Sequence, residues 1–161
     1  MAWTAVGEGI LEDCQDAADL LGFPVPCPSL LPGETQDVRC PKVAVAGDAS
    51  TARHRGCVWG EGFHLVPPMP GGEVTHIVIS GGRSRFTDCD GTEFDVVPAG
   101  EAEATLYECS ELGGLHAYHV LALWDVDGVW YAVSSHVNED RGVHEEIVSR
   151  LVDGVHLVPP R

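Results

Sequence analysis

Six scattered cysteines constrain this sequence more than any other feature. No two of them are closer than 13 residues, so the close spacings of zinc ribbons, CxxC redox motifs and haem-attachment motifs are absent. An even number of widely spaced cysteines is typical of structural disulfides made in an oxidising compartment, and buried free thiols in a cytoplasmic protein are the alternative. The pattern predicts an extracytoplasmic or secreted protein whose disulfide cysteines are Cys14, Cys27, Cys40, Cys57, Cys89 and Cys109.

Chain geometry favours local pairs among these cysteines, although sequence alone does not choose rigorously among the pairings that six allow. A helix over 8–21 that stops at Gly22 and continues as extended chain brings Cys27 back beside Cys14, within bridging distance. A second bond would pin the least regular part of the chain, and the last two cysteines then remain for each other. The predicted set is Cys14–Cys27, Cys40–Cys57 and Cys89–Cys109.

The chain is also strongly acidic. It carries 25 acidic and 9 basic side chains, for a formal net charge of −16. A surface of this sign repels phosphate groups, so nucleic acid and anionic lipid are poor partners, and an unknown protein or small ligand is expected instead. Three explanations of the acidity stay open: a solvated face, an adaptation to high salt, and a docking surface for a cationic partner.

The length of 161 residues fits a single domain over 1–161. No apolar run is long enough to cross a bilayer, so no transmembrane segment is expected in this chain. The first nine residues lack the basic and apolar regions of a signal peptide. An exported form is therefore expected to have lost its signal or anchor.

Apolar residues recur at helical spacing in two segments. The first, 8–21, is followed by Gly22, which is well placed to end a helix, and the second, 143–152, is followed by Gly154. Region 24–72 is rich in proline and glycine and is expected to be irregular, because its prolines forbid helix. Its only strand-like pieces are VAVA, 43–46, and FHLV, 63–66.

Range 75–137 is expected to hold antiparallel strands. Two β-rich runs within 116–137 flank Asp127-Gly128, the strongest short signal for a hairpin. Both faces of the first run are largely apolar, so it is expected to be central and covered on both sides. The predicted fold class is α+β: an antiparallel β-sheet with an N-terminal and a C-terminal helix packed on it, stabilised by disulfides. Further strands are predicted at 75–80, 93–97 and 103–109.

These segments resemble a known group of proteins. DCQDAADLLGFPVPCPSLLPG, 13–33, is similar to the opening of uncharacterised extracytoplasmic domains and lipoproteins of high-GC Gram-positive bacteria. THIVIS, 75–80, looks like one of their strands, and the segment 107–138 is similar to their central hairpin. The resemblance implies export and a small α+β fold, related to PsbP-like or anti-sigma-factor extracytoplasmic domains, and it implies no activity.

Two histidines are the first candidate site. Counting outward from Asp127-Gly128 places His119 opposite His136 across the hairpin. Two imidazoles on facing strands, with a third ligand nearby, can bind zinc or copper. The plainer interpretation is a pair of packed or hydrogen-bonded rings.

A second candidate site is the segment DCDGTEFD, 88–95. Its alternating carboxylates around a turn can coordinate a hard cation such as calcium, although the pattern is not that of an EF-hand. A solvated turn beside a disulfide is the plainer interpretation. The candidate ligands are Asp88, Asp90, Glu93 and Asp95.

No catalytic motif is present: the chain has no GxSxG, HExxH, P-loop or GxGxxG after a strand. A nucleophile made of Cys109 and His116 would be consumed by a structural disulfide. The tryptophans could form an aromatic platform for sugar or peptide, but residues placed like Trp124 and Trp130 more often serve sheet packing. The leading hypothesis is a non-enzymatic extracytoplasmic binding or display module. The alternatives are a metal-binding protein or metal-dependent hydrolase using His119 and His136, and a self-assembling protein that associates through its acidic face or sheet edge.

Overall fold

A computed structural model describes most of the chain. The described residues are 2–33, 57–59, 61–66, 77–85, 89, 91–109, 118–136 and 141–161. The strand-like piece predicted at 43–46 lies outside them.

The central element is a seven-stranded antiparallel sheet with the strand order β4-β5-β6-β10-β9-β8-β7. Three strands predicted from alternation and β-branching are present with slightly different bounds. The members are β4 (Val58–Trp59), β5 (Gly62–Leu65), β6 (Ile77–Gly82), β7 (Thr92–Ala99), β8 (Ala102–Glu108), β9 (His119–Val126) and β10 (Val129–His136).

The predicted hairpin forms the middle of this sheet. β9 and β10 pair along their whole length and turn at Asp127 and Gly128, whose φ angles of 51° and 81° suit a two-residue type I′ turn. The first six residues of β9 are buried, and β9 lies between β10 and β8. The prediction of a central strand covered on both sides is confirmed.

The sheet has two different faces. Side chains alternate along β10, so Tyr131 and Val133 point to one face and join the main apolar cluster. We call this the first face. Ala132 and Ser134 point to the opposite, second face, where the apolar cluster is much smaller. The two clusters therefore divide at the sheet.

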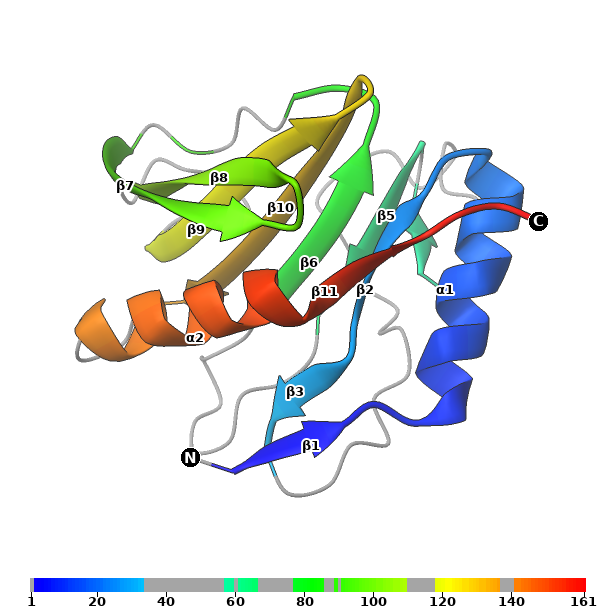
Figure 1. The fold of residues 1–161 in the computed structure, drawn as a ribbon, viewed down its shortest axis with the longest axis horizontal. Coiled ribbons are helices and arrows are strands. Elements are labelled where there is room, and N and C mark those ends of the chain that lie inside the picture. The colour runs from blue at the N-terminus through cyan, green and yellow to red at the C-terminus, as the bar shows by residue number, and fades with distance from the viewer. Residues whose placement is uncertain are drawn as a thin grey trace.

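Two helices and two short ribbons complete the fold (Figure 1). α1 (Glu8–Leu21) has the predicted bounds, and Gly22 ends it in the left-handed region with φ 75°. α2 (Arg141–Gly154) is longer than predicted at both ends. The ribbons are antiparallel pairs, β1 (Trp3–Ala5) with β3 (Leu30–Pro32), and β2 (Val25–Pro28) with β11 (Val155–Val158).

The helices differ in how they reach the sheet. α2 packs on β9 and β10 through the first face, and four of its buried side chains belong to the main cluster. α1 instead lies mainly against β2, with a smaller contact to β5. Figure 1 shows the β2–β11 ribbon running between α1 and the strands of the sheet. The predicted packing of a helix on the sheet is therefore seen clearly for α2. α1 contacts the sheet mainly through the β2–β11 ribbon.

Two of the apolar side chains that recur at helical spacing in 8–21 and 143–152 are exposed. Leu11 in α1 is 41% exposed and Val143 in α2 is 46% exposed, and His144 is buried next to Val143. Periodicity places side chains on a face, but only the packed partner decides where that face ends.

The region predicted to be irregular contains strands. β2, β3, β4 and β5 all fall within 24–72, and only β5 was anticipated there. The prolines do keep the chain extended, and its partners β1 and β11 come from the two ends of the sequence. A strand whose partner is so distant leaves no local turn signal.

A close approach fixes the β2–β11 ribbon to the first face. A Cβ atom on Gly81 of β6 would lie 2.8 Å from Cδ of Pro26, so only glycine allows β2 to pack there. The hydroxyl of Tyr131 donates a 2.8 Å hydrogen bond to the carbonyl oxygen of Pro24. Burial of this phenol, reinforced by the charge of Asp127, raises the pKa of Tyr131 to about 12.

Candidate functional site

Two of the predicted disulfides are present. Cys14 in α1 bonds Cys27 in β2, and Cys89 bonds Cys109, with Cα–Cα distances of 6.0 and 5.0 Å. The predicted bond between Cys40 and Cys57 lies outside the described residues because Cys40 does. Each described bond joins separate segments of the fold.

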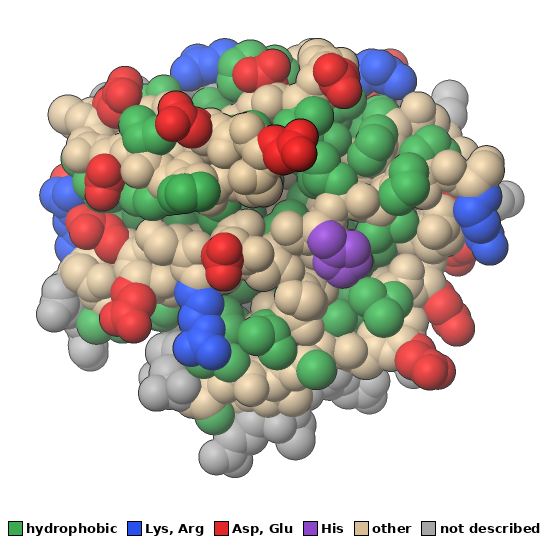
Figure 2. Space-filling view, viewed as in Figure 1, with side chains coloured by type: hydrophobic (Ala, Val, Ile, Leu, Met, Phe, Trp, Pro, Cys, Tyr) green, Lys and Arg blue, Asp and Glu red, His purple; other side chains and the backbone are tan. Residues whose placement is uncertain are grey.

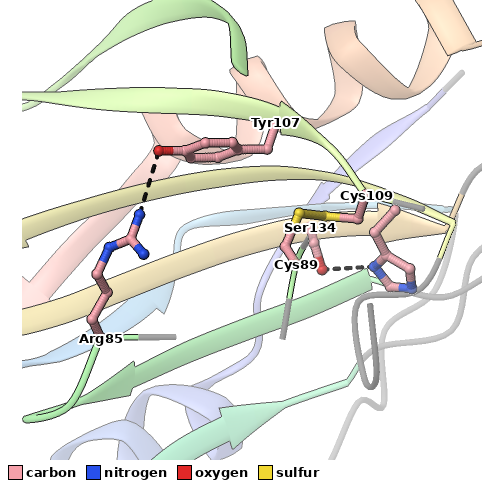
Figure 3. Close-up of a disulfide and its surroundings, with 6 residues drawn as sticks. Arg85, Cys89, Tyr107, Cys109 and Ser134 are labelled. Carbon is pink, nitrogen blue, oxygen red and sulfur yellow. Dashed lines mark hydrogen bonds between the residues drawn. A yellow bond between two sulfur atoms is a disulfide. The ribbon is translucent and has the colours of Figure 1, made fainter. Parts of the chain in front are cut away.

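The Cys89–Cys109 disulfide lies on the second face of the sheet (Figure 3). A Cβ atom on Gly91 would lie 1.9 Å from the carbonyl oxygen of Glu108, so this crossing requires glycine. The amide of Cys109 donates a hydrogen bond to the carbonyl oxygen of His119. The backbone of Cys109 is therefore hydrogen-bonded to the first residue of β9.

The two candidate histidines face each other as predicted. His119 and His136 are register partners, and their ring centroids are 5.2 Å apart in an edge-to-face arrangement. His119 is 1% exposed, and its Nδ1 is hydrogen-bonded to Oγ of Ser134 at 2.7 Å. Tyr118, which is 52% exposed and has a φ of 61°, contacts the ring of His136. The result is a row of three rings that leads from the surface to a buried imidazole.

Serine–histidine hydrogen bonds recur across the sheet. Ser135 on the first face bonds Nδ1 of His144 in α2 at 2.7 Å, and Ser80 on the second face bonds Nδ1 of His64 at 2.9 Å. Both serines are 0% exposed, as is Ser134. The hydroxyls of these serines are thus hydrogen-bonded to imidazole rings inside the protein.

A metal site of three or more histidine, cysteine, aspartate or glutamate side chains is not found in the part of the chain that the structure describes. Of the candidate calcium ligands, Glu93 and Asp95 are exposed on β7, while Asp88 and Asp90 lie outside the described residues. A register shift separates Glu93 from Asp95, and Oδ1 of Asp95 accepts a hydrogen bond from the amide of Val96. Glu93 and Asp95 therefore lie on strand β7 and not on a turn that they share.

The second face carries an aromatic patch that sequence reasoning did not assemble. Trp130 on β10 and Tyr107 on β8 are both half-buried, and their direct cross-strand partners are the exposed carboxylates of Asp125 and Glu93. We call these four residues the aromatic face. The guanidinium of Arg85 lies 5.6 Å from the ring centroid of Trp130. It also reaches the hydroxyl of Tyr107 at 3.5 Å (Figure 3). The only sequence signal was the presence of Trp130 itself, since the four residues come from four strands, β7 to β10, that must align before they share a surface.

Arginine is used in the same way elsewhere in the described residues. The guanidinium groups of Arg83, Arg141 and Arg150 lie 5.2, 4.3 and 4.4 Å from aromatic ring centroids. Arg161 forms its ion pairs with Asp16 and Asp19 of α1, and its hydrogen bonds lower the pKa of Asp19. Figure 2 shows the side that carries α2 and β11, where carboxylates are scattered and basic side chains are few.

No described helix has the length and apolar character needed to span a membrane. Comparison of the chain with protein-family models, curated proteins and solved structures finds no match. The assignment of a function therefore depends on the geometry above.

Proposed function

We propose that the protein is a non-catalytic binding module that acts outside the cytoplasm. The observation that carries this proposal is the aromatic face, where Trp130 and Tyr107 stay half-exposed beside unburied carboxylates. Aromatic rings flanked by polar groups are the side chains that dominate binding surfaces. Both helices belong to the main cluster on the opposite side of the sheet.

The disulfides support the extracytoplasmic part of the proposal. Bonds such as Cys14–Cys27 and Cys89–Cys109 persist in oxidising compartments and are rare in the cytosol. The same bonds remove Cys109 as a nucleophile, and the hydroxyls of Ser80, Ser134 and Ser135 are buried. These features favour binding over catalysis.

The binding proposal is tested by NMR titration of the oxidised protein. Three ligand classes are added in turn: a cationic peptide, an anionic peptide and a neutral oligosaccharide. We expect one class to shift the resonances of Trp130 and Tyr107, and Trp130→Leu to abolish the effect. Trp3→Leu is the matched control, because Trp3 also carries an arginine on its ring but packs against the main cluster and not the small one. If no class perturbs the aromatic face, the proposed function is wrong.

The compartment is tested separately by thiol chemistry. The protein, folded without reductant, should contain no reactive thiol at the four cysteines of the described disulfides. Denaturant unfolding with and without reductant then measures how far the fold depends on those bonds. Equal stability in both conditions would remove the argument for an oxidising compartment.

A metal-binding protein is the second candidate function, and one specific observation favours it. His119 and His136 are in ring contact, and a hydrogen bond from Nδ1 of His119 to Ser134 fixes the orientation of that ring, as outer-shell partners do for metal-ligating histidines. Elemental analysis for zinc and copper tests it. Stoichiometric metal that is lost in His136→Ala, but kept in the exposed control His156→Ala, would establish this function in place of the first.

Self-assembly through a sheet edge is the third candidate. The edge strand β7 carries the exposed charges Glu93 and Asp95, a register shift between them, and Pro98. Each of these features discourages pairing with another strand. We therefore expect a monomer, and native mass at several salt concentrations checks it.

A further inference from the structure

The aromatic face has a chemistry that selects one kind of ligand. Each aromatic side chain has a carboxylate directly across the strand: Asp125 is opposite Trp130, and Glu93 is opposite Tyr107. The face of an indole ring attracts cations through its quadrupole, and a neighbouring carboxylate adds to that attraction. The surface therefore favours a positively charged group over a neutral or negative one.

The protein already places a cation on this surface. Arg85 follows β6, is exposed, and extends its guanidinium over Trp130 to the hydroxyl of Tyr107. The contact with the tyrosine, at 3.5 Å, is at the limit of a hydrogen bond. Arg85 thus shows that a guanidinium fits the site between Trp130 and Tyr107, which we call the seat. The contacts of Arg85 in the seat are weak.

Charge complementarity points the same way. Glu93 and Asp125 form no ion pair with any cation of the described residues, Arg85 included. The net charge of −16 also attracts cationic partners over a longer range. Arginine suits the seat better than lysine, because its planar guanidinium stacks on a ring and binds a carboxylate with two donors.

We propose that the aromatic face docks an arginine-bearing segment of a partner protein, and that the partner's guanidinium replaces Arg85 over Trp130. This inference rests on the proposed binding function and names its ligand class. Arg85 then acts as an internal competitor that lowers the affinity for the partner. Removing it should strengthen binding, which is the opposite of what the loss of a contact residue would do.

The central experiment compares two single substitutions that remove the same charge. The probe is a short peptide with two arginines, with lysine and citrulline versions as controls, titrated by calorimetry in low and in half-molar salt. Arg85→Ala should tighten the arginine peptide by about two- to fivefold, the range that an exposed cation–π contact provides. Arg83→Ala should give less than half of that gain, because Arg83 stacks on Phe23 and not on Trp130.

A second pair of variants tests the carboxylates. Asp125→Asn should weaken the arginine peptide more than Asp153→Asn, which removes an exposed carboxylate from α2. The citrulline peptide should bind the native protein much more weakly, because it keeps the shape but loses the charge. Both pairs use exposed positions, so the variants are expected to fold.

The proposal is overturned if Arg85→Ala and Arg83→Ala have equal effects, or if arginine and lysine peptides bind alike. It is also overturned if a sugar or an anionic peptide binds the aromatic face and the arginine peptide does not. In that last case the binding function itself survives with another ligand. Failure of every ligand class would remove both.

Discussion

The two faces of the central sheet are built from the same strands but in different ways. On the first face, Tyr131 and Val133 belong to one large apolar cluster that also takes in both helices. On the second face the apolar cluster is small, and it is bordered by hydrogen-bonded histidines, a disulfide and half-exposed aromatic rings. Consecutive residues of β10 thus point to the large cluster on one side, and to the small cluster and the half-buried Trp130 and His136 end positions on the other. This contrast is the reason why we propose the second face as the binding surface.

The largest expected effect comes from the two disulfides. Cys14 and Cys27 are both 0% exposed within the main cluster, whereas Cys89 is half-buried on the second face. Replacing Cys14 and Cys27 by alanine should cost about 4 kcal/mol of unfolding free energy, and replacing Cys89 and Cys109 about 3 kcal/mol. Denaturant unfolding without reductant measures both. Loop length alone predicts the reverse order of the two losses, since the sequence separations are 13 and 20. If that reverse order is measured, packing does not distinguish the two faces.

A matched pair of leucines sharpens the comparison. Leu151 of α2 faces the main cluster and Leu121 of β9 faces the small one, and each is 1% exposed. Leu151→Ala should cost about 4 kcal/mol and Leu121→Ala about 2 kcal/mol, because the cost of a cavity depends on how far its surroundings can close. Chemical denaturation of both variants checks the order. Equal losses would mean that the second face is packed as rigidly as the first.

Local features of this fold could be predicted from the sequence. The turn at Asp127-Gly128 fixed the register, so the His119–His136 pair followed by counting, and helical spacing gave both bounds of α1. The Cys14–Cys27 pair followed from the helix stop at Gly22, and the Cys89–Cys109 pair was predicted only as the pair that then remained.

Features that depend on distant segments could not be predicted. β11 pairs with β2 from the opposite end of the chain, with Leu157 opposite Pro26, and neither strand carries a turn signal. The aromatic face likewise needs β8, β9 and β10 in register before Tyr107 and Trp130 share a surface. Its arginine comes from a further segment, after β6. Periodicity reports which side chains share a face within a strand, but it does not report which strands are neighbours.

Two neighbouring serines test the faces at a smaller scale. Ser135→Ala removes the first-face bond to His144, and Ser134→Ala removes the second-face bond to His119. Each should cost about 1–2 kcal/mol, as expected for a buried hydrogen bond that loses one partner. Only Ser135→Ala should speed amide hydrogen exchange in α2, because His144 belongs to that helix while His119 is held by the strand ladder. Equal protection of α2 in both variants would show that this bond does not anchor the helix.

The smallest expected effect is the pH dependence that His64 adds on the second face. Burial lowers the pKa of this imidazole below its usual value of 6.5, and its Nδ1 is bonded to Ser80. The unfolded chain therefore binds a proton at a higher pH than the folded protein does, so His64 favours folding above pH 6.5 and that contribution is lost as the pH falls towards the lowered pKa. On the first face Tyr131 acts in the opposite direction: its pKa of about 12 makes the folded protein lose stability as the pH rises above the normal phenol value of 10.0.

The free energy of unfolding is measured from neutral to mildly acidic pH. It should fall less steeply with decreasing pH in His64→Gln than in the native protein. His156→Gln, at an exposed position, should leave this pH dependence unchanged. If His64→Gln keeps the full slope, the acid sensitivity lies with other groups, and the second face does not set the acid limit of the fold.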